Sequence, residues 1–302
     1  MPTGNLPENF RRNIRNAFPE GAAWLESLPA LIADCERRWR VRVADTPFDL
    51  SYNFVAPAVT ENGIDAVVKI GVPCAELRNE IAALGLYAGG AAVELLDADA
   101  RRGMLLLERA RPGSKLSEVD DDEQATVIAA RTARELWRQL PPAHAFPGPA
   151  DWALGLRRLR QRFDGGTGPF DPRLVGAAES LFGELLGSSQ APMLVHGDLH
   201  HFNILSSTRR QWLAIDPKGL AAEPAYEVGA LLRNPGPGRY LDPAVQRGRV
   251  AVLADQLGFD PRRIAGWDAA QAVLSAWWTY EEWGNGWELI MVCAGILLEM
   301  HT

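Results

Sequence analysis

The spacing of hydrophobic residues predicts that the chain begins as helix and then turns to strand. Between positions 10 and 40, apolar residues recur three and four positions apart, which is the period of one face of a helix. From position 48 to 70 the pattern is that of two strands, because the apolar run SYNFVAPAV is followed by the turn sequence ENG at 61–63 and then by AVVKI. We therefore expect a β-hairpin here.

A helix and two further strands are expected to follow the hairpin. Apolar residues at helical spacing predict a helix over 74–88. Short apolar runs predict strands over 92–96 and 103–108, after which the sequence RPG at 111–113 should break the chain. The first third is thus predicted to be a small antiparallel sheet with one inserted helix.

The remaining two thirds of the chain have a mainly helical pattern. The predicted features, in order, are a helix over 124–140, a flexible loop over 164–169, a helix from Asp171-Pro172 to Gly187, and short strands over 193–195 and 212–215. A helical, tryptophan-rich tail ends the chain. The fold class expected from these patterns is α+β.

Composition adds a size argument to this picture. The chain has 302 residues, of which 47% are hydrophobic and 23% charged, and this composition argues against a disordered, collagenous or coiled-coil protein. At roughly 150 residues per domain, the length predicts two lobes. We place them at 1–110 and 111–302, where the strand pattern gives way to the helical one.

Charge and targeting signals narrow the class of partner. With 38 acidic against 31 basic residues and a net charge of -7, the surface repels nucleic acid and is compatible with a cationic ligand. The three cysteines form no CxxC pair, the first residues lack the apolar core of a signal peptide, and no apolar run reaches the length of a membrane span. We expect a soluble, cytoplasmic protein without membrane contact, and a monomer by default.

The densest group of polar residues lies around Asp198. An apolar strand over 193–195 leads into HGD, Asn203 follows, and Asp216 ends the apolar strand over 212–215. A hairpin-like return between these two strands would bring Asp198, Asn203 and Asp216 together. Asparagine and aspartate oxygens suit Mg²⁺, and Asp198 would then be free to orient and deprotonate a hydroxyl.

The histidines in this segment permit a competing interpretation. His196, His200 and His201, together with Asp198, have the composition of a zinc hydrolase site. Their spacing does not match a helical two-histidine motif, and no further ligand motif follows. We expect His196 to brace the loop, and His200 and His201 to lie near substrate or solvent.

The strings HGDLHHFNIL, AIDPKG and EPAYEVGALLRNP resemble those of the aminoglycoside phosphotransferases, in the streptomycin 6-kinase and hydroxyurea phosphotransferase group. The resemblance covers roughly residues 50–300 and is most specific over 194–235. It implies a protein-kinase-like two-lobe fold and ATP- and Mg²⁺-dependent phosphorylation of a small-molecule hydroxyl, with a streptomycin-type aminoglycoside as the first expectation. Hydroxyurea and the choline, homoserine and fructosamine kinase substrates are the alternatives, and a non-catalytic nucleotide-binding protein is another.

The resemblance also implies a role for several residues. Asp198 matches the catalytic base, and Asn203 and Asp216 match the magnesium ligands. Lys69 in AVVKI matches the strand lysine that holds the α- and β-phosphates, and Glu80 matches the helix glutamate that pairs with it. The lobe over 1–110 would thus bind the nucleotide.

Other positions match the family pattern less closely. Glu76 competes with Glu80 as the partner of the strand lysine, since it lies four residues earlier on the predicted helix. No G-x-G-x-x-G precedes that lysine, so Ser51 and nearby amides would cover the phosphates. Backbone groups at Glu108 and Ala110 match the hinge that binds adenine, and Glu227 stands where relatives commonly carry aspartate.

The C-terminal stretch AWWTYEEWGNGWE contains candidates for acceptor binding. Trp278, Glu281 and Glu282 would suit a polyhydroxylated cation through stacking and charge-assisted hydrogen bonds. Core packing is the competing explanation for the tryptophans. Lys218, beside Asp216, would either contact phosphate or substrate, or neutralise the nearby acids.

Overall fold

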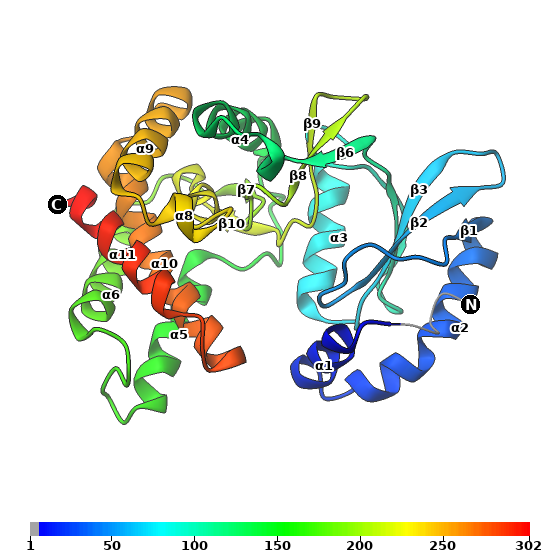
Figure 1. Ribbon diagram of the computed structural model, residues 1–302, viewed down its shortest axis with the longest axis horizontal. Helices are drawn as coiled ribbons and strands as arrows, with labels where there is room; N and C mark the ends of the chain where they lie inside the picture. The colour runs from blue at the N-terminus through cyan, green and yellow to red at the C-terminus, as the bar shows by residue number, and fades with distance from the viewer. Residues whose placement is uncertain (1–5) are drawn as a thin grey trace. The chain divides into compact units, whose positions relative to one another are not determined.

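The computed structural model describes residues 6–302, and the chain divides into two compact units (Figure 1). The first unit ends at Gly113 and also includes Ser207–Arg209. The second unit consists of Ser114–Ser206 and Arg210–Thr302.

The first unit is built on an antiparallel sheet with the strand order β1-β2-β3-β5-β4. Its strands are β1 (Val41–Val43), β2 (Phe54–Thr60), β3 (Asp65–Ile70), β4 (Leu95–Asp99) and β5 (Met104–Glu108). The hairpin of β2 and β3 is confirmed, and Gly63 takes a positive φ of 78° in its turn, a conformation that costs glycine little. Lys69 lies opposite Val55 of β2 and Leu105 of β5.

Three helices complete this unit: α1 (Glu8–Ala17), α2 (Gly21–Trp39) and α3 (Ala75–Tyr87). The predicted helical segment over 10–40 is therefore two helices, and Gly21 allows them to approach, because a Cβ there would lie 2.2 Å from the Ile14 carbonyl oxygen. Ala66, Val68 and Ile70 share one apolar core with residues of α1 and α2. Figure 1 shows α2 (blue) and α3 (cyan) on opposite sides of the sheet.

Two predictions for this region are wrong. The strand expected over 92–96 is β4 and begins three residues later, because its register with β5 pairs Leu95 with Leu107 and Asp99 with Met104. The RPG sequence does not simply break the chain, since Pro112–Lys115 forms β6. This strand is at the edge of a sheet, where a proline costs no ladder hydrogen bond.

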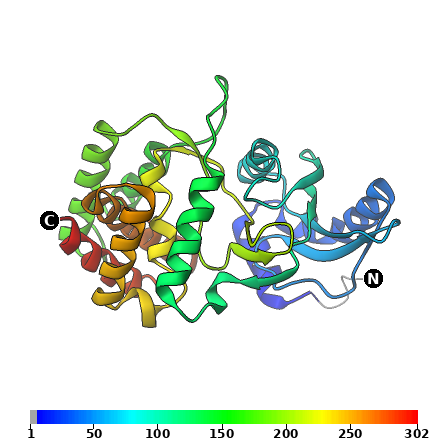
Figure 2. The ribbon, with the colours of Figure 1, turned by 90° about the horizontal axis from the view of Figure 1, so that it is seen from above.

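The second unit is mainly helical, as predicted. Its helices are α4 (Asp122–Leu136), α5 (Pro149–Arg162), α6 (Pro172–Gly187), α7 (Gly229–Leu232), α8 (Pro237–Tyr240), α9 (Pro243–Leu257), α10 (Pro261–Trp283) and α11 (Glu288–His301). The central helix α10 packs against α5, α6, α9 and α11, and α4 (green) runs beside α9 (orange) in Figure 2. No helix in the described part of the chain combines the length and apolar character that crossing a bilayer requires.

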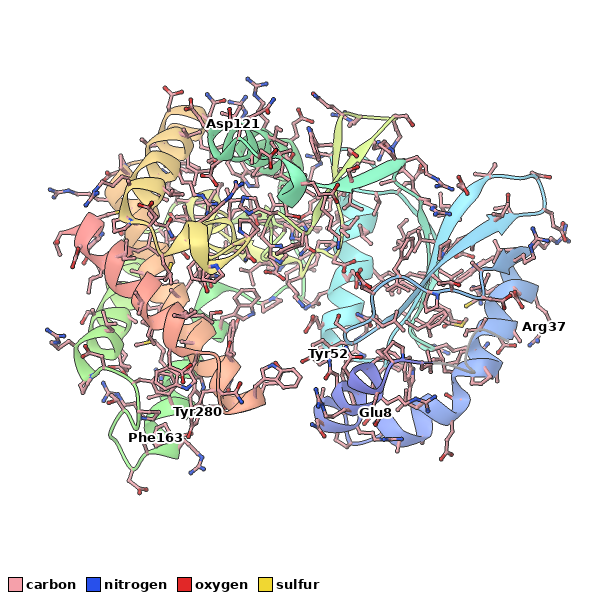
Figure 3. All side chains as sticks on the ribbon, viewed as in Figure 1. Glu8, Arg37, Tyr52, Asp121, Phe163 and Tyr280 are labelled. Carbon is pink, nitrogen blue, oxygen red and sulfur yellow. The ribbon has the colours of Figure 1, made fainter. Side chains whose placement is uncertain are left out.

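Some helix predictions in this unit need correction. α4 begins after Asp121, whose carboxylate accepts the Gln124 N–H at 3.1 Å (Figure 3), but it ends at Leu136 rather than at 140. Beyond this point the chain leaves the helix and Arg138 pairs with Leu194 as an isolated bridge. The sequence pattern missed α5 entirely.

The loop expected to be flexible over 164–169 is largely exposed, but it is anchored at Thr167. A Cβ on Gly168 would lie 2.4 Å from the Phe163 ring. The Phe163 ring in turn contacts Tyr280 of α10, with 5.9 Å between ring centroids (Figure 3). The loop residue Thr167 is buried and donates to the Phe170 carbonyl, so local contacts hold this segment.

Four short strands carry the polar segment: β7 (Met193–Val195), β8 (Ile204–Ser207), β9 (Trp212–Ala214) and β10 (Leu220–Ala222). The expected return between the strands over 193–195 and 212–215 is wrong. β9 pairs with β8 in a sheet of order β6-β8-β9, whereas β7 pairs with β10. Chain proximity explains this, since β8 and β9 are joined by one tight turn.

Candidate active site

Asp198 and Asn203 lie in the loop between β7 and β8, and Asp216 follows β9. The side-chain nitrogen Nδ2 of Asn203 donates to the Asp198 carbonyl at 3.0 Å. The Ile215 N–H donates to the Asn203 carbonyl at 2.9 Å and so closes the base of the β8–β9 hairpin. The hairpin thereby holds the segments that carry all three residues together. Burial lowers the pKa of His200, and the negative charges of Asp198 and Asp216 oppose this shift.

His196 braces this loop, as predicted from the sequence. It is fully buried, its Nε2 lies 2.8 Å from the Ile215 carbonyl oxygen, and its Nδ1 accepts the Asp198 N–H at 3.2 Å. A neutral ring with the proton on Nε2 satisfies both contacts. Burial lowers the pKa of His196 from 6.5 to about 4.

We expect the stability of the protein to fall as the pH drops from about 6.5 towards 4. The pKa of His196 is lower in the folded state, so in this interval only the unfolded chain takes up a proton there. The stabilisation that neutral His196 provides is complete above pH 6.5 and is lost as the pH falls towards 4. His196→Leu removes both ring contacts, so it should be less stable than wild type at about pH 7.5, and the difference should narrow by up to about 3 kcal/mol towards pH 4. Urea unfolding at several pH values measures the free energy of unfolding of both proteins. A difference between them that stays constant with pH would contradict the lowered pKa of His196.

Glu227 holds the backbone of the same loop. Its carboxylate accepts the N–H of His196 at 2.5 Å and that of Gly197 at 3.0 Å. It is buried, and burial raises the pKa of Glu227 to about 8. Gly197 needs its positive φ of 84°, and a Cβ there would meet Leu220 at 3.2 Å. Glu227 is therefore an anchor of this loop.

His200 and His201 do not share one environment. The His200 ring lies in the loop with its Nε2 3.7 Å from the Asp198 carboxylate, and its side chain is 17% exposed. His201 was expected near substrate or solvent, but it is fully buried, and within the described residues neither ring nitrogen has a hydrogen-bond partner. That expectation is wrong because the path of the loop directs the His201 ring into the interior of the second unit.

The chemistry of Asn203 and Asp216 fits a magnesium ion. The side-chain nitrogen of Asn203 donates a hydrogen bond within the loop, so its side-chain oxygen is the atom that would bind the metal. Asp216 is exposed and takes a positive φ of 58°, and such strain often marks a functional position. Mg²⁺ commonly takes one or two protein ligands beside water and phosphate oxygens. Within residues 6–302 no group of three or more His, Cys, Asp or Glu converges to hold a metal.

In the first unit, Lys69 forms an ion pair with Glu80. The distance from Nζ to Oε1 is 2.6 Å, and the two side chains are only 3% and 7% exposed. Strand alternation explains the placement, because Val68 and Ile70 face the apolar core and Lys69 faces the side of α3. Glu76, the competing candidate, is exposed at the start of α3.

The other nucleotide candidates lie at two loops of this unit. Ser51 is exposed, and its carbonyl accepts a hydrogen bond from Asn13 Nδ2 at 3.2 Å. The N–H of Glu108, at the end of β5, is already donated to the Glu94 carbonyl at 2.9 Å. Ala110 lies between β5 and β6. Sequence reasoning did not find Asn13, since a helix asparagine carries no signal of such a contact.

The acceptor candidates lie near the C-terminal end of α10. Glu281 forms an ion pair with Arg158 at 3.4 Å. Trp278 is half-buried and meets the Trp152 ring edge-on, with 5.6 Å between centroids. A Cβ on Gly197 would lie 3.5 Å from Trp152, so this aromatic pair begins beside the Asp198 loop. Trp152 was missed because the pattern did not predict α5.

Two more sequence candidates have defined positions. Glu282 is exposed, and on a helix it shares a face with Trp278, four positions earlier. Lys218 is half-buried directly after Pro217, and its N–H donates to the His196 carbonyl at 2.8 Å.

Solved structures share this arrangement of a small antiparallel sheet and a helical unit. Choline kinase LicA from Streptococcus pneumoniae aligns with a TM-score of 0.62 at 15% identity, over 91% of this chain and 99% of that chain. A thermostable mutant of an aminoglycoside phosphotransferase, in a ternary complex with ADP and hygromycin B, aligns with a TM-score of 0.59 at 12% identity, over 89% and 98%. The fold is therefore protein-kinase-like, as predicted.

Sequence comparison identifies the family. A family model described as aminoglycoside/hydroxyurea antibiotic resistance kinase matches residues 38–283. Streptomycin 6-kinase of Streptomyces glaucescens is 32% identical, over 92% of this chain and 91% of that protein. Hydroxyurea phosphotransferase of Kitasatospora aureofaciens is 31% identical, over 89% and 78%. The chain belongs to the aminoglycoside/hydroxyurea antibiotic resistance kinase family, and it is an ATP-dependent phosphotransferase with a hydroxyl acceptor.

Proposed function

We propose that this kinase phosphorylates an aminoglycoside antibiotic of the streptomycin type. The observation that carries the proposal is the loop around Asp198, which His196 and Glu227 brace in a chain similar to streptomycin 6-kinases. Asp198 orients the acceptor hydroxyl and accepts its proton while the hydroxyl oxygen forms a bond to the γ-phosphorus of ATP. The bond from that phosphorus to the bridging oxygen breaks, and ADP leaves.

Four residues are proposed to hold the phosphates and the metal ion. Lys69 binds the α- and β-phosphates, and Glu80 orients its ammonium group through their 2.6 Å contact. Asn203 and Asp216 would bind Mg²⁺, which neutralises charge on the phosphate oxygens when it is present.

Adenine and the phosphates also need backbone partners. At the hinge, the Glu108 carbonyl and the Ala110 N–H are the proposed contacts for adenine, because the Glu108 N–H is already bonded to Glu94. Ser51 and its neighbouring amides are proposed to cover the phosphates, and Lys218 to contact a phosphate or the acceptor.

The acceptor is proposed to bind against Trp152 and Trp278, with Glu282 as its carboxylate partner. Aromatic faces and a carboxylate suit a polyhydroxylated cation. Glu281 is a weaker candidate, because Arg158 already pairs with it. An aminoglycoside as large as streptomycin would contact Trp152, Trp278 and Glu282 together, whereas hydroxyurea is too small to do so.

The two neighbouring glutamates provide a matched test of this surface. Glu282→Gln should raise the KM for the acceptor about tenfold, because it removes a charge-assisted hydrogen bond. Glu281→Gln should change this KM less than threefold, and neither variant should change the KM for ATP. Steady-state kinetics measures all three values. Equal effects of the two substitutions would contradict the proposed surface.

A substrate screen tests the function itself. We would couple ADP release to a spectrophotometric assay with streptomycin, hydroxyurea, choline, homoserine and a fructosamine as acceptors, with Asp198→Ala as the control. Turnover of streptomycin alone would support the proposal, and turnover of hydroxyurea alone would replace it. Calorimetric binding of ATP without transfer to any acceptor would favour a non-catalytic nucleotide-binding protein.

The assembly and location of the protein belong to the same proposal. We infer a monomer that acts in the cytoplasm, where ATP is supplied. Light scattering of the purified chain would give the mass of the particle, and cell fractionation would test the location.

A further inference from the structure

Arg209 occupies an unusual position in the chain. It lies in the turn between β8 and β9, and Ser207–Arg209 group with the first unit although the chain on both sides groups with the second. An arginine at a hairpin tip is ordinarily a solvated charge. The contacts of Arg209 are of a different kind.

The guanidinium of Arg209 is held by five hydrogen bonds within the first unit. Its Nε and Nη2 donate to the two carboxylate oxygens of Glu108 at 2.7 and 2.8 Å, a bidentate pairing with strong geometric specificity. Nη1 donates to the carbonyl of Gly90 at 3.2 Å. Nη2 also donates to the carbonyls of Gly89 at 2.9 Å and Ala92 at 2.7 Å.

These partners come from the end of β5 and from the loop between α3 and β4. Glu108 is further tied to that loop, because its carboxylate accepts the Glu94 N–H at 3.0 Å. A backbone bond reinforces the attachment, since the Thr208 N–H donates to the Arg111 carbonyl at 2.7 Å. The tip of the hairpin is thus attached to both sides of the segment proposed to bind adenine.

The base of the same hairpin carries the proposed magnesium ligands. Asn203 immediately precedes β8, and Asp216 follows β9 after one residue. The bond from the Ile215 N–H to the Asn203 carbonyl closes this base at 2.9 Å. Arg209 and the two residues proposed to hold the metal therefore belong to one continuous hairpin segment of the chain.

We propose that Arg209 is a positioning residue for nucleotide binding. Its contacts with Glu108 and with the α3–β4 loop fix the hinge strand and the tip of the hairpin to each other. The adenine contacts of the first unit are then preorganised, so less ordering is needed when the nucleotide binds. This inference rests on the roles proposed above for those residues.

The adjacent arginine provides a matched control. Arg210 forms one ion pair with Glu135 at 2.7 Å, and the two side chains are 49% and 54% exposed. An exposed pair of this kind contributes little. Arg210→Ala removes the same charge at the same turn without touching Glu108 or the loop carbonyls.

The experiment compares binding of Mg·ADP to wild type, Arg209→Ala and Arg210→Ala by calorimetry. Arg209→Ala should raise the Kd roughly tenfold or more, and Arg210→Ala should leave it within about twofold. In steady-state assays, Arg209→Ala should raise the KM for ATP and leave the KM for the acceptor unchanged. A merely structural role would lower the thermal midpoint and leave the Kd of the folded protein unchanged, and this result would overturn the proposal.

A second pair of variants covers the case in which Arg209→Ala does not fold. Arg209→Lys cannot form the bidentate contact, and Glu108→Gln removes its charged acceptor. Each should raise the Kd for Mg·ADP, and together they should raise it no further than the larger single effect, because both break one contact. Additive or absent effects would overturn the proposal. No acceptor is needed, so an incorrect acceptor assignment leaves this test intact, whereas wild type that fails to bind Mg·ADP would contradict the proposed function instead.

Discussion

Asp198→Asn is expected to lower kcat by a factor of about 10³ and to leave nucleotide binding intact. General-base catalysis is commonly worth 10²–10⁴-fold, and an amide cannot accept the proton of the acceptor hydroxyl. The side chain of Asp198 is 37% exposed, so its loss leaves no buried cavity. Single-turnover assays with streptomycin and with any acceptor found by the screen would measure the effect.

The hydrogen bonds that Asp198 makes within the loop come from its backbone, so the substitution should preserve them. Its N–H bonds to the His196 ring and its carbonyl accepts from Asn203, and asparagine keeps both bonds. Calorimetry with Mg·ADP should give a Kd close to that of wild type. If kcat stayed within about tenfold of wild type, Asp198 would not be the base, and another proton acceptor would have to be sought in the loop.

Lys69→Arg is expected to reduce ATP turnover about 100-fold or more, although it keeps the positive charge. Loss of one well-placed donor to a developing charge commonly costs 10²–10³-fold. Lys69 and Glu80 are both buried and their charged atoms are 2.6 Å apart, which leaves space for a compact ammonium group. A planar guanidinium is larger and would pair with both Glu80 oxygens, drawing the charge away from the phosphates.

The remaining lysines make a control possible, because the chain contains only Lys69, Lys115 and Lys218. Lys115 is exposed at the end of β6, so Lys115→Arg should leave kcat and both KM values unchanged. Near-wild-type turnover by Lys69→Arg would contradict the proposed phosphate contact. Glu80→Gln should also reduce turnover, and it should destabilise the fold by about 3 kcal/mol, since it removes the charged carboxylate from a buried ion pair.

Several parts of the molecule were predictable because their signals are local in the sequence. The β2–β3 hairpin and α3 follow from side-chain period and turn residues. The bracing role of His196 was also inferred from its place beside Asp198. The family assignment is confirmed by the match over residues 38–283, and it came from three short strings whose spacing is itself the signal.

Other predictions failed because strand pairing and burial are not local properties. The pattern located the apolar runs of β7 and β9, but only the folded sheets decide that β9 pairs with β8. His201 looked like a loop residue, yet the turn of the chain buries it. The arginine-rich sequence of α5 hid its thin apolar stripe, and Trp152 was overlooked with it.

The sequence by itself determined the family, the fold class and the motif around Asp198, because these depend on residue types at short, regular spacings. Tertiary structure alone decided which glutamate is buried beside Lys69, since Glu76 and Glu80 are on similar faces of α3, yet Glu80 is buried in the ion pair and Glu76 is exposed. It also decided that Arg209 forms a bidentate ion pair with Glu108, a residue far away in the sequence. Contacts between distant segments depend on three-dimensional packing, and no periodicity along the chain records them.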